Sequence, residues 1–260
     1  MRAVANIWRR ELLSLFAAAP AYVVLAVFLG LAGFFFYNIL VAVVNQTFLV
    51  DFRSQQFGGP PPPIDVPSIV LRGYLGIAAQ LLLFLMPLLT MSSLAEERRR
   101  GTMELLLTSP LGVGQLVLGK FLAVLAVIAL MIGITFLFPL LLATYTKVEF
   151  VAVAAGYGGL LLLSGGLAAL GLFVSSLTDS QVIAAVLGFG LMLLLGVIHL
   201  GGEGAQGAWG ELLKQLSVFE HFQDLAKGVV DSGDVVFYLS LIALGLFLTY
   251  RSVETLRWRG

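Results

Sequence analysis

The sequence predicts an all-α integral membrane protein with six transmembrane helices. Of its 260 residues, 59% are hydrophobic and only 12% are charged, whereas soluble domains carry about 25% charged residues. Six stretches of the chain approach the roughly 20 apolar residues that a helix needs to cross the hydrocarbon core of a bilayer. Because these stretches leave no room for a soluble domain of ordinary size, residues 1–260 are expected to form a single transmembrane domain.

Residues 1–16 are expected to form a helix that lies in the headgroup plane of the membrane. One face of its helical wheel is apolar, with Val4, Ile7, Trp8, Leu12 and Leu15. The opposite face carries Arg2, Asn6, Arg9 and Arg10. A frayed basic tail is the alternative. The residues AAAP at 17–20 imitate a signal-peptidase site, but the apolar stretch continues far beyond them, so cleavage is not expected.

The spanning helices are expected at residues 21–44, 75–94, 116–144, 151–174, 182–200 and 235–250. With the N-terminus inside, the cytoplasmic parts hold ten Lys and Arg residues and the outer parts hold five. The positive-inside rule therefore predicts both termini in the cytoplasm, most naturally at a bacterial inner membrane. Small residues one turn apart, Gly165 with Ala169 and Gly171 with Ser175, predict close packing between helices.

Two long connections are then expected on the periplasmic side. Residues 45–74 contain four consecutive prolines, which favour an extended and stiff segment. Residues 201–233 repeat apolar side chains at Leu212, Leu216, Phe219 and Ala226. This spacing predicts a short amphipathic helix, between the fifth and sixth spanning helices, that lies on the outer leaflet or dips back into it.

Several kinds of chemistry are disfavoured by the sequence. There is no cysteine, so disulfides and thiolate metal sites are excluded, and His199 and His221 are too far apart to suggest a metal site. The residues GQLVLGK at 114–120 match the start of a phosphate-binding loop, but Phe121 replaces the Ser or Thr that would hold magnesium and no strand is predicted before them. Lys120 is instead expected to reach the cytoplasmic headgroups. Asn38 is expected to bond to a neighbouring helix.

Residues 95–115 interrupt the apolar chain with five consecutive charges and a short oily run. Glu96 to Arg100 are expected to extend the second spanning helix into water, and Gly101 to end it. Thr102 can cap a new helix, with Glu104 in its first turn, and this helix must end before Pro110. Its leucines would be costly to expose, so a protein groove or the membrane surface should cover them. An ordinary loop with a leucine patch that faces the headgroups is the alternative.

The stretch EERRRGTMELLLTSPLGVGQLVLGK resembles the segment between the second and third spanning helices of type-2 ABC transporter permeases. The next cytoplasmic turn, SSLTDSQVIAAVLGF, and the C-terminal YLSLIALGLFLTYRSVETLRWR also resemble that family, particularly its gliding-motility permease (GldF-like) branch. In that family, a six-helix permease pairs with a second permease and with two cytoplasmic ATPase subunits. A short coupling helix after the second span sits in a groove of the ATPase.

The resemblance implies two contacts with an ATPase subunit. The coupling segment would comprise Glu96, Glu97, Arg98, Arg99, Arg100, Gly101, Thr102, Met103, Glu104, Leu105, Leu106 and Leu107. The second contact would comprise Ser176, Thr178, Asp179 and Gln181, with Asp179 capping the fifth spanning helix. No catalytic residue, metal site or cofactor is implied for this chain, since ATP and magnesium would be held by the partner. A second permease, either identical or related, and membrane lipid are the other expected partners.

Three functions remain open at this point. The leading hypothesis is the permease subunit of a bacterial ATP-driven ABC complex for export or mechanical work, which is not itself an enzyme. The alternative is a membrane anchor that uses ATPase movement to act on a periplasmic partner and transports nothing. A secondary transporter ranks last, because the spanning segments carry almost no ionisable groups that could relay protons. No nucleic-acid partner is expected, and the substrate is not specified by the sequence.

Overall fold

The computed structural model confirms the all-α membrane fold. It describes residues 2–17, 19–57, 65–103, 112–204, 211 and 214–257, and in these parts it has six helices that are long and apolar enough to cross a membrane. The ten helices with assigned bounds in these parts are α1 (Arg2–Ala17), α2 (Ala19–Phe57), α3 (Val66–Thr90), α4 (Ser92–Arg99), α6 (Val113–Thr135), α7 (Leu137–Ala143), α8 (Phe150–Leu177), α9 (Gln181–Gly204), α11 (Val218–Ala226) and α12 (Ser232–Arg257).

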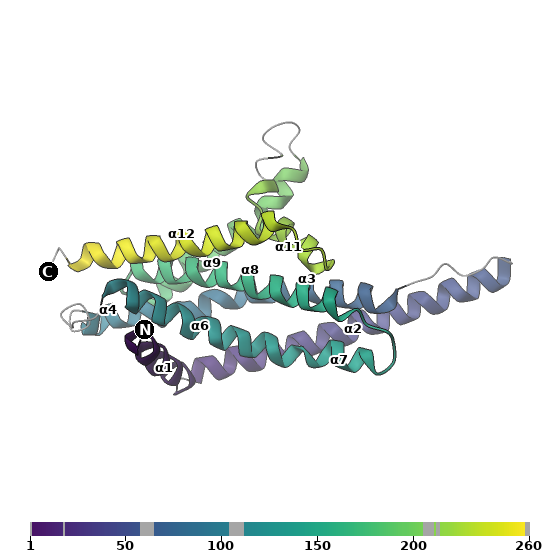
Figure 1. Cartoon of the computed structure of the whole chain (residues 1–260), viewed down its shortest axis with the longest axis horizontal. Helices are drawn as coiled ribbons and strands as arrows, with labels where there is room; N and C mark the ends of the chain where they lie inside the picture. Colours follow the sequence, from purple (N-terminus) through teal and green to yellow (C-terminus); the bar gives the residue numbers. More distant parts are fainter. Residues whose placement is uncertain are drawn as a thin grey trace.

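The long helices lie side by side along the long axis of the molecule (Figure 1). Helices α1 and α4 and the C-terminal part of α12 lie at one end, which is called the α4 end below. Helix α7 and the beginnings of α3 and α8 lie at the other end, called the α7 end. The positive-inside prediction would place the α4 end in the cytoplasm.

Helix α8 is the centre of the bundle and packs against α3, α6, α9, α11 and α12. Most of its residues are buried, and small residues allow this close approach. A Cβ added at Gly245 of α12 would lie 2.8 Å from the backbone carbonyl carbon of Ala169, and one at Gly166 would lie 2.8 Å from a methyl group of Leu241. The predicted close packing of the small residues in this helix is therefore confirmed.

Helix α2 is much longer than predicted. Its 39 residues span about 58 Å at 1.5 Å per residue, compared with about 30 Å for a hydrocarbon core. The expected connection at 45–74 is therefore mostly helical, since α2 continues to Phe57 and α3 begins at Val66. Asp65 caps α3 by accepting a hydrogen bond from the backbone N–H of Ser68. The segment 58–64, with its prolines, lies outside the described residues.

Helix α1 has the predicted extent, but one side of it lies on protein. Ile7 is buried against Gly119 of α6, where an added Cβ would lie 2.6 Å from an Ile7 methyl group. The indole Nε1 of Trp8 donates a hydrogen bond to the carbonyl of Leu122 at 3.2 Å. The arginines Arg9 and Arg10 remain exposed. The predicted amphipathic face is therefore used at least partly for packing on α6.

Helix α11 is amphipathic, as predicted between the fifth and sixth spans, but it buries a different set of side chains. Val218, Phe222 and Leu225 are buried, whereas Leu216 precedes the helix and is exposed. Leu225 packs against Gly159 of α8, where an added Cβ would lie 2.7 Å from the Leu225 Cβ. Leu212 lies outside the described residues. The helix is thus docked on the protein bundle through its apolar face.

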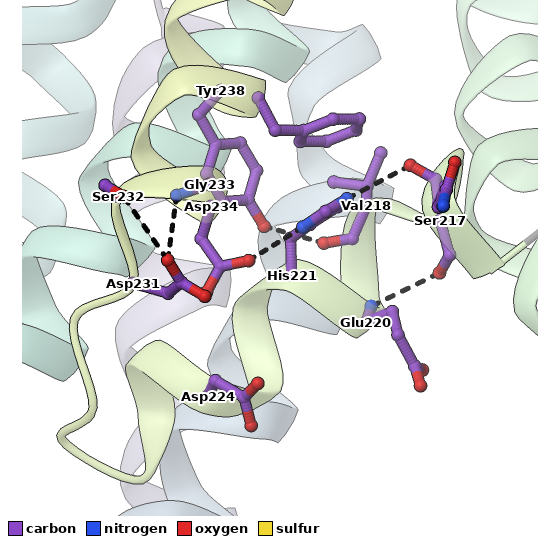
Figure 2. A network of polar contacts seen from close by, with 12 residues as sticks. Ser217, Val218, Glu220, His221, Asp224, Asp231, Ser232, Gly233, Asp234 and Tyr238 are labelled. Atoms are coloured by element: carbon purple, nitrogen blue, oxygen red, sulfur yellow. Dashed lines mark hydrogen bonds and ion pairs between the residues drawn. The ribbon is translucent and has the colours of Figure 1, made fainter.

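Polar contacts fasten α11 to the start of α12 (Figure 2). The His221 Nδ1 lies 2.7 Å from Asp234 Oδ1, and its Nε2 lies 3.0 Å from the carbonyl oxygen of Gln215. The His221 ring also stacks on Phe237. The buried hydroxyl of Tyr238 donates to the carbonyl of Val218 at 2.6 Å. His221 therefore acts as a structural bridge between the two helices.

Replacement of His221 by alanine is expected to loosen α11 while leaving the bundle folded. The change removes the two polar contacts of the ring and its stacking on Phe237, and it leaves the carboxylate of Asp234, which is largely buried, without its partner. Hydrogen exchange of the amides at 218–226 should become about tenfold faster, whereas exchange in α8 should not change. Glu220→Gln is the matched control, because this side chain is exposed on the same helix. Equal exchange rates in the wild type and the alanine variant would show that the bridge does not hold α11.

Candidate coupling site

Helix α4 begins after a single residue, Met91, that follows α3, and the junction is fastened to α8. The backbone N–H groups of Leu94 and Ala95 both donate to the hydroxyl of Ser175 at 3.1 Å. That hydroxyl in turn donates to the carbonyl of Met91 at 3.0 Å. Ser175 is fully buried, so these three bonds satisfy all the hydrogen-bonding capacity of its hydroxyl. The charged segment is therefore a helical continuation of the second span, as expected, and its direction is set by α8.

Arg98 connects α4 to the end of α8, at a carbonyl that α12 also contacts. Its Nη1 donates to the backbone carbonyl of Ser176 at 2.6 Å, and the hydroxyl of Ser252 in α12 donates to the same oxygen at 3.3 Å. Ser176 itself is buried. The sequence placed Arg98 and Ser176 in two separate contacts with a partner, whereas the structure joins them to each other. Together they hold α4, α8 and α12 as one unit.

Lys120 does not reach the headgroups, in contrast to the prediction. Only 2% of its side chain is exposed, and its Nζ lies 2.9 Å from Glu97 Oε1 and 3.1 Å from Glu11 Oε2. Arg10 lies at the edge of this group, with its Nη2 3.9 Å from each carboxylate. The three side chains Lys120, Glu97 and Glu11 are called the lysine cluster below. It joins α6, α4 and α1.

In the lysine cluster, each carboxylate is paired with a cation of the same chain. Glu11 and Glu97 are only 15% and 14% exposed, so each needs an opposite charge nearby. Lys120 supplies one charge to both, and Arg10 supplies a more distant second one. Glu97 Oε2 is buried and has no hydrogen-bond partner in the described part of the chain. Glu97 was expected to face water and an ATPase, but it is largely occupied inside this chain.

In the turn after α4, the helix ends at Gly101 as predicted, but the side chains of Thr102 and Met103 do not have their predicted roles. Gly101 has a φ of +70°, which glycine adopts easily, and it ends the helix. The hydroxyl of Thr102 donates to the carbonyl of Glu97 at 3.3 Å. Met103 is buried in a small cluster with Leu94, Val113 and Val253, so its side chain is not on an exposed docking face. Glu104, Leu105, Leu106 and Leu107 lie outside the described residues.

The second predicted contact lies beside the first. Gln181, at the start of α9, and Glu96 line the same cavity of about 280 Å³, which Met91 and Ser92 also line. Thr178 accepts a hydrogen bond from the backbone N–H of Ser180. Asp179 does not cap α9 as expected, since the hydroxyl of Ser180 accepts from the N–H of Ile183 at 3.5 Å. The side chain of Asp179 is exposed instead.

Several charged and apolar side chains at the α4 end are not used in these internal contacts. Arg99, Arg100, Leu177 and Asp179 are exposed. Glu96 is partly exposed and pairs with Arg100. These five side chains are called the α4 surface below. They come from α4 and its C-cap, from the end of α8 and from the turn before α9, next to the contacts made by Arg98, Ser175 and the lysine cluster.

A family of known proteins matches most of the chain. Residues 45–250, which make up most of the chain and contain the whole described α4 surface, match the model of a family described as ABC-2 family transporter protein. The chain belongs to the ABC-2 transporter family. It is thus a multi-pass membrane component of the permease type. No curated protein matches the ABC-2 chain, so the comparison does not assign it to a branch of the family.

The sequence did contain a signal for the lysine cluster of the ABC-2 chain. Glu11 lies four residues after Ile7 and four before Leu15, so it falls in the middle of the apolar face of α1. A carboxylate at such a position indicates a cation on the opposite surface. Lys120, within an otherwise apolar helix, was the available partner. Ser175 had no comparable signal, because a single serine in a row of small residues is common in packed membrane helices.

Proposed function

We propose that this chain is the permease subunit of an ATP-driven ABC complex, in which a separate ATPase docks on the α4 surface. The observation that carries the proposal is the way this surface is attached to the bundle. Through Ser175, Arg98 and Ser176, helix α4 is bonded to α8, and Ser252 of α12 is bonded to the same carbonyl of Ser176. Because α8 is the central helix, a force applied to α4 would reach the whole bundle and not only a surface loop.

The lysine cluster adds a second route from the same surface. A displacement of α4 carries Glu97, which is held by Lys120 on α6, and Lys120 is also bound to Glu11 on α1. The movement would therefore reach α1 and the α1–α6 contact at Gly119 as well. ATP and magnesium would bind in the partner. The α4 end would lie in the cytoplasm and the bundle in a bacterial inner membrane, in line with the distribution of Lys and Arg.

The working assembly would contain two permease subunits, identical or related, and two ATPase subunits. This part of the proposal, like the assignment to the gliding-motility (GldF-like) branch, rests on the resemblance of the segments at 96–120, 175–189 and 238–259 to type-2 permeases. The coupling helix proper would be completed by Glu104 to Leu107. The cargo would be exported, or the movement would be used as mechanical work.

One observation favours a role in mechanical work on a periplasmic partner. Helix α2 runs past the other helices at the α7 end (Figure 1). Its last turns expose large apolar side chains, with Phe48 69% and Phe52 65% exposed. A stiff helix that carries such side chains away from the bundle is suited to contact another protein. The alternative function, a membrane anchor that transmits movement and transports nothing, is supported by this feature.

Co-purification with the cognate ABC ATPase tests the proposal. The wild-type chain should form a stable complex, and Arg99→Glu with Arg100→Glu should weaken ATPase binding about tenfold through like-charge repulsion and loss of the Arg100–Glu96 pair. Arg53→Glu, an exposed arginine on the outer part of α2, is the matched control and should bind normally. Failure of the wild type to bind that ATPase in lipid would refute the proposal.

A second measurement separates the two forms of the proposal. Transport in proteoliposomes that contain the complex would support the transporter form. A stable complex with a periplasmic protein, lost after Phe48→Asp and Phe52→Asp but retained after Arg53→Glu, would support the mechanical form.

A further inference from the structure

A groove of about 650 Å³ lies between α3, α9 and α11, away from the α4 surface. This volume is within the range of about 300–1,000 Å³ that is typical of small-molecule sites. Its walls include Gln80 and Phe84 from α3, Val197 from α9 and Phe219 from α11. It is called the α3 groove below. None of its lining residues belongs to the predicted coupling segments, so the proposed function does not account for it.

The polarity of the α3 groove changes regularly along α3. Arg72, Gly76, Gln80 and Phe84 all line the groove and are spaced four residues apart, so they form one stripe on the helix. Successive members are about 6 Å apart along the axis. All four are exposed in the described structure. From the α7 end inward, the stripe therefore presents a cation, an open space, an amide and an aromatic ring.

The charged residues that line the groove are both cationic. Lys227 is paired with Asp224 at 2.7 Å, but that pair is largely exposed and therefore weak. Arg72 has no hydrogen bond or ion pair within the described parts of the chain, and it lies in the second turn of a spanning helix. Glu149 lines a small adjoining cavity with both cations. An arginine near the membrane boundary that lacks a protein partner is expected to bind an anion or to reach water.

The inner part of the groove is apolar. Leu83, Phe84 and Leu193 line it, with Phe219 and Phe222 from α11. Gly196 of α9 allows a close approach here, since an added Cβ would lie 3.2 Å from a Leu83 methyl group and 3.5 Å from the Phe219 ring. These side chains would contact a hydrocarbon chain without any unpaired polar group. Gln80 lies between the cations and this apolar part.

We propose that the α3 groove binds an anionic amphiphile of the phospholipid class. The phosphate of the headgroup would pair with Arg72 and Lys227, the Gln80 amide would donate to the ester linkage, and one acyl chain would lie along Phe84, Leu193 and Phe219. The order of the groups along α3 matches the order of the groups in such a molecule. The inference goes beyond the proposed function, because this binding requires neither an ATPase nor transport.

Native mass spectrometry of the purified full-length chain tests the site. Phosphatidylglycerol and phosphatidylcholine with the same acyl chains are the probes, and the wild type is expected to retain phosphatidylglycerol at least tenfold more strongly. Arg72→Gln should remove most of this preference, since it removes the unpaired charge but keeps a long polar side chain. Lys147→Gln, an exposed cation that lines neither cavity, should retain the full preference.

Gly76→Leu tests whether the groove itself is occupied. An added Cβ at Gly76 would meet nothing within 4 Å, so the larger side chain fits the backbone and fills the open space. Retention of both lipids should fall at least tenfold. Gly158→Leu is the matched control, because Gly158 of α8 is equally open and lies outside the groove. A normal thermal unfolding temperature of both variants would show that they are folded.

Three results would overturn the proposal. The first is phosphatidylglycerol retention by Gly76→Leu equal to that of the wild type. The second is equal binding of inorganic phosphate and phosphatidylglycerol, which would indicate an anion site without a place for the chain. The third is a change in oligomeric state after Gly76→Leu without loss of lipid, which would indicate that a second copy of this chain covers the groove.

Discussion

Replacement of Lys120 by methionine is expected to lower the free energy of unfolding by about 3–5 kcal/mol, the usual cost of removing one partner from a buried ion pair. The lysine is 2% exposed and serves two carboxylates that are themselves largely buried. Without it, Glu11 and Glu97 repel each other in a largely buried region, where their remaining ion-pair contact among the described residues is Arg10 at 3.9 Å. Thermal unfolding in detergent, followed by circular dichroism, measures the loss.

Two further variants distinguish loss of charge from loss of packing. The combined change Glu11→Gln, Lys120→Met and Glu97→Gln should recover most of the lost stability, because it leaves no unpaired charge in the lysine cluster. Lys147→Met removes an exposed lysine and should have no measurable effect. If the triple variant were as unstable as Lys120→Met, the cluster would be stabilised by side-chain packing and not by charge pairing.

Enlargement of Gly245 is expected to have the second large effect. An added Cβ would lie 2.8 Å from the carbonyl carbon and 2.8 Å from the Cβ of Ala169, so α12 would have to move away from α8. Because the carbonyl carbon belongs to the backbone of the central helix, it cannot turn aside as a side chain can. Gly245→Ala should cost about 1–3 kcal/mol. Gly245→Leu should prevent the correct packing of α12.

Size-exclusion chromatography in detergent and thermal unfolding measure this effect. Gly158→Leu is again the control, because an added Cβ there meets open space in the same helix bundle. It should elute and unfold like the wild type. A Gly245→Leu variant that was equally stable would mean that α8 and α12 do not pack as closely as the structure describes. The attachment of Ser176 to Ser252 would then also be in doubt.

These two predictions concern the parts that transmit movement in the proposed function. The contact of α8 with α12 near Gly245 and the bond from Arg98 to Ser176 belong to the same unit. The lysine cluster connects that unit to α1 and α6. A variant that is folded but has lost one of these connections should still bind an ATPase. Movement of the ATPase should then be transmitted only weakly to the bundle. Lys120→Met and its triple variant therefore also serve in the ATPase experiment.

Much of the fold could be predicted from local sequence. Apolar length alone identified the six spans, since a bilayer requires about 20 apolar residues whatever the neighbours are. The break at Gly101 followed from the freedom of glycine to take a positive φ. The extension of α2 to Phe57 was not predicted. The prolines at 60–63 indicate a loop, but the polar residues before them also form a helix.

The candidate site was predicted less well, for reasons that differ between residues. Glu97 and Met103 were expected on a docking surface, but both are used inside the chain. Asn38 was expected to bond across helices, yet its amide donates to the carbonyl of Phe34 one turn earlier at 2.7 Å. A polar residue in a membrane helix has several ways to satisfy its hydrogen bonds, and sequence spacing does not choose among them.

The sequence by itself determined that this chain is a six-span helical membrane protein, that a charged helix follows the second span, and where that helix ends. These properties depend on residues near one another in the chain. Only the tertiary structure decided that Lys120 is paired with Glu11 and Glu97, that Arg98 binds Ser176, and that Arg72 and Gln80 face one groove with α9 and α11. Those outcomes depend on which helices pack together and on how each is rotated about its axis. The residues that become neighbours in this way set the energy of a buried charge or an open groove.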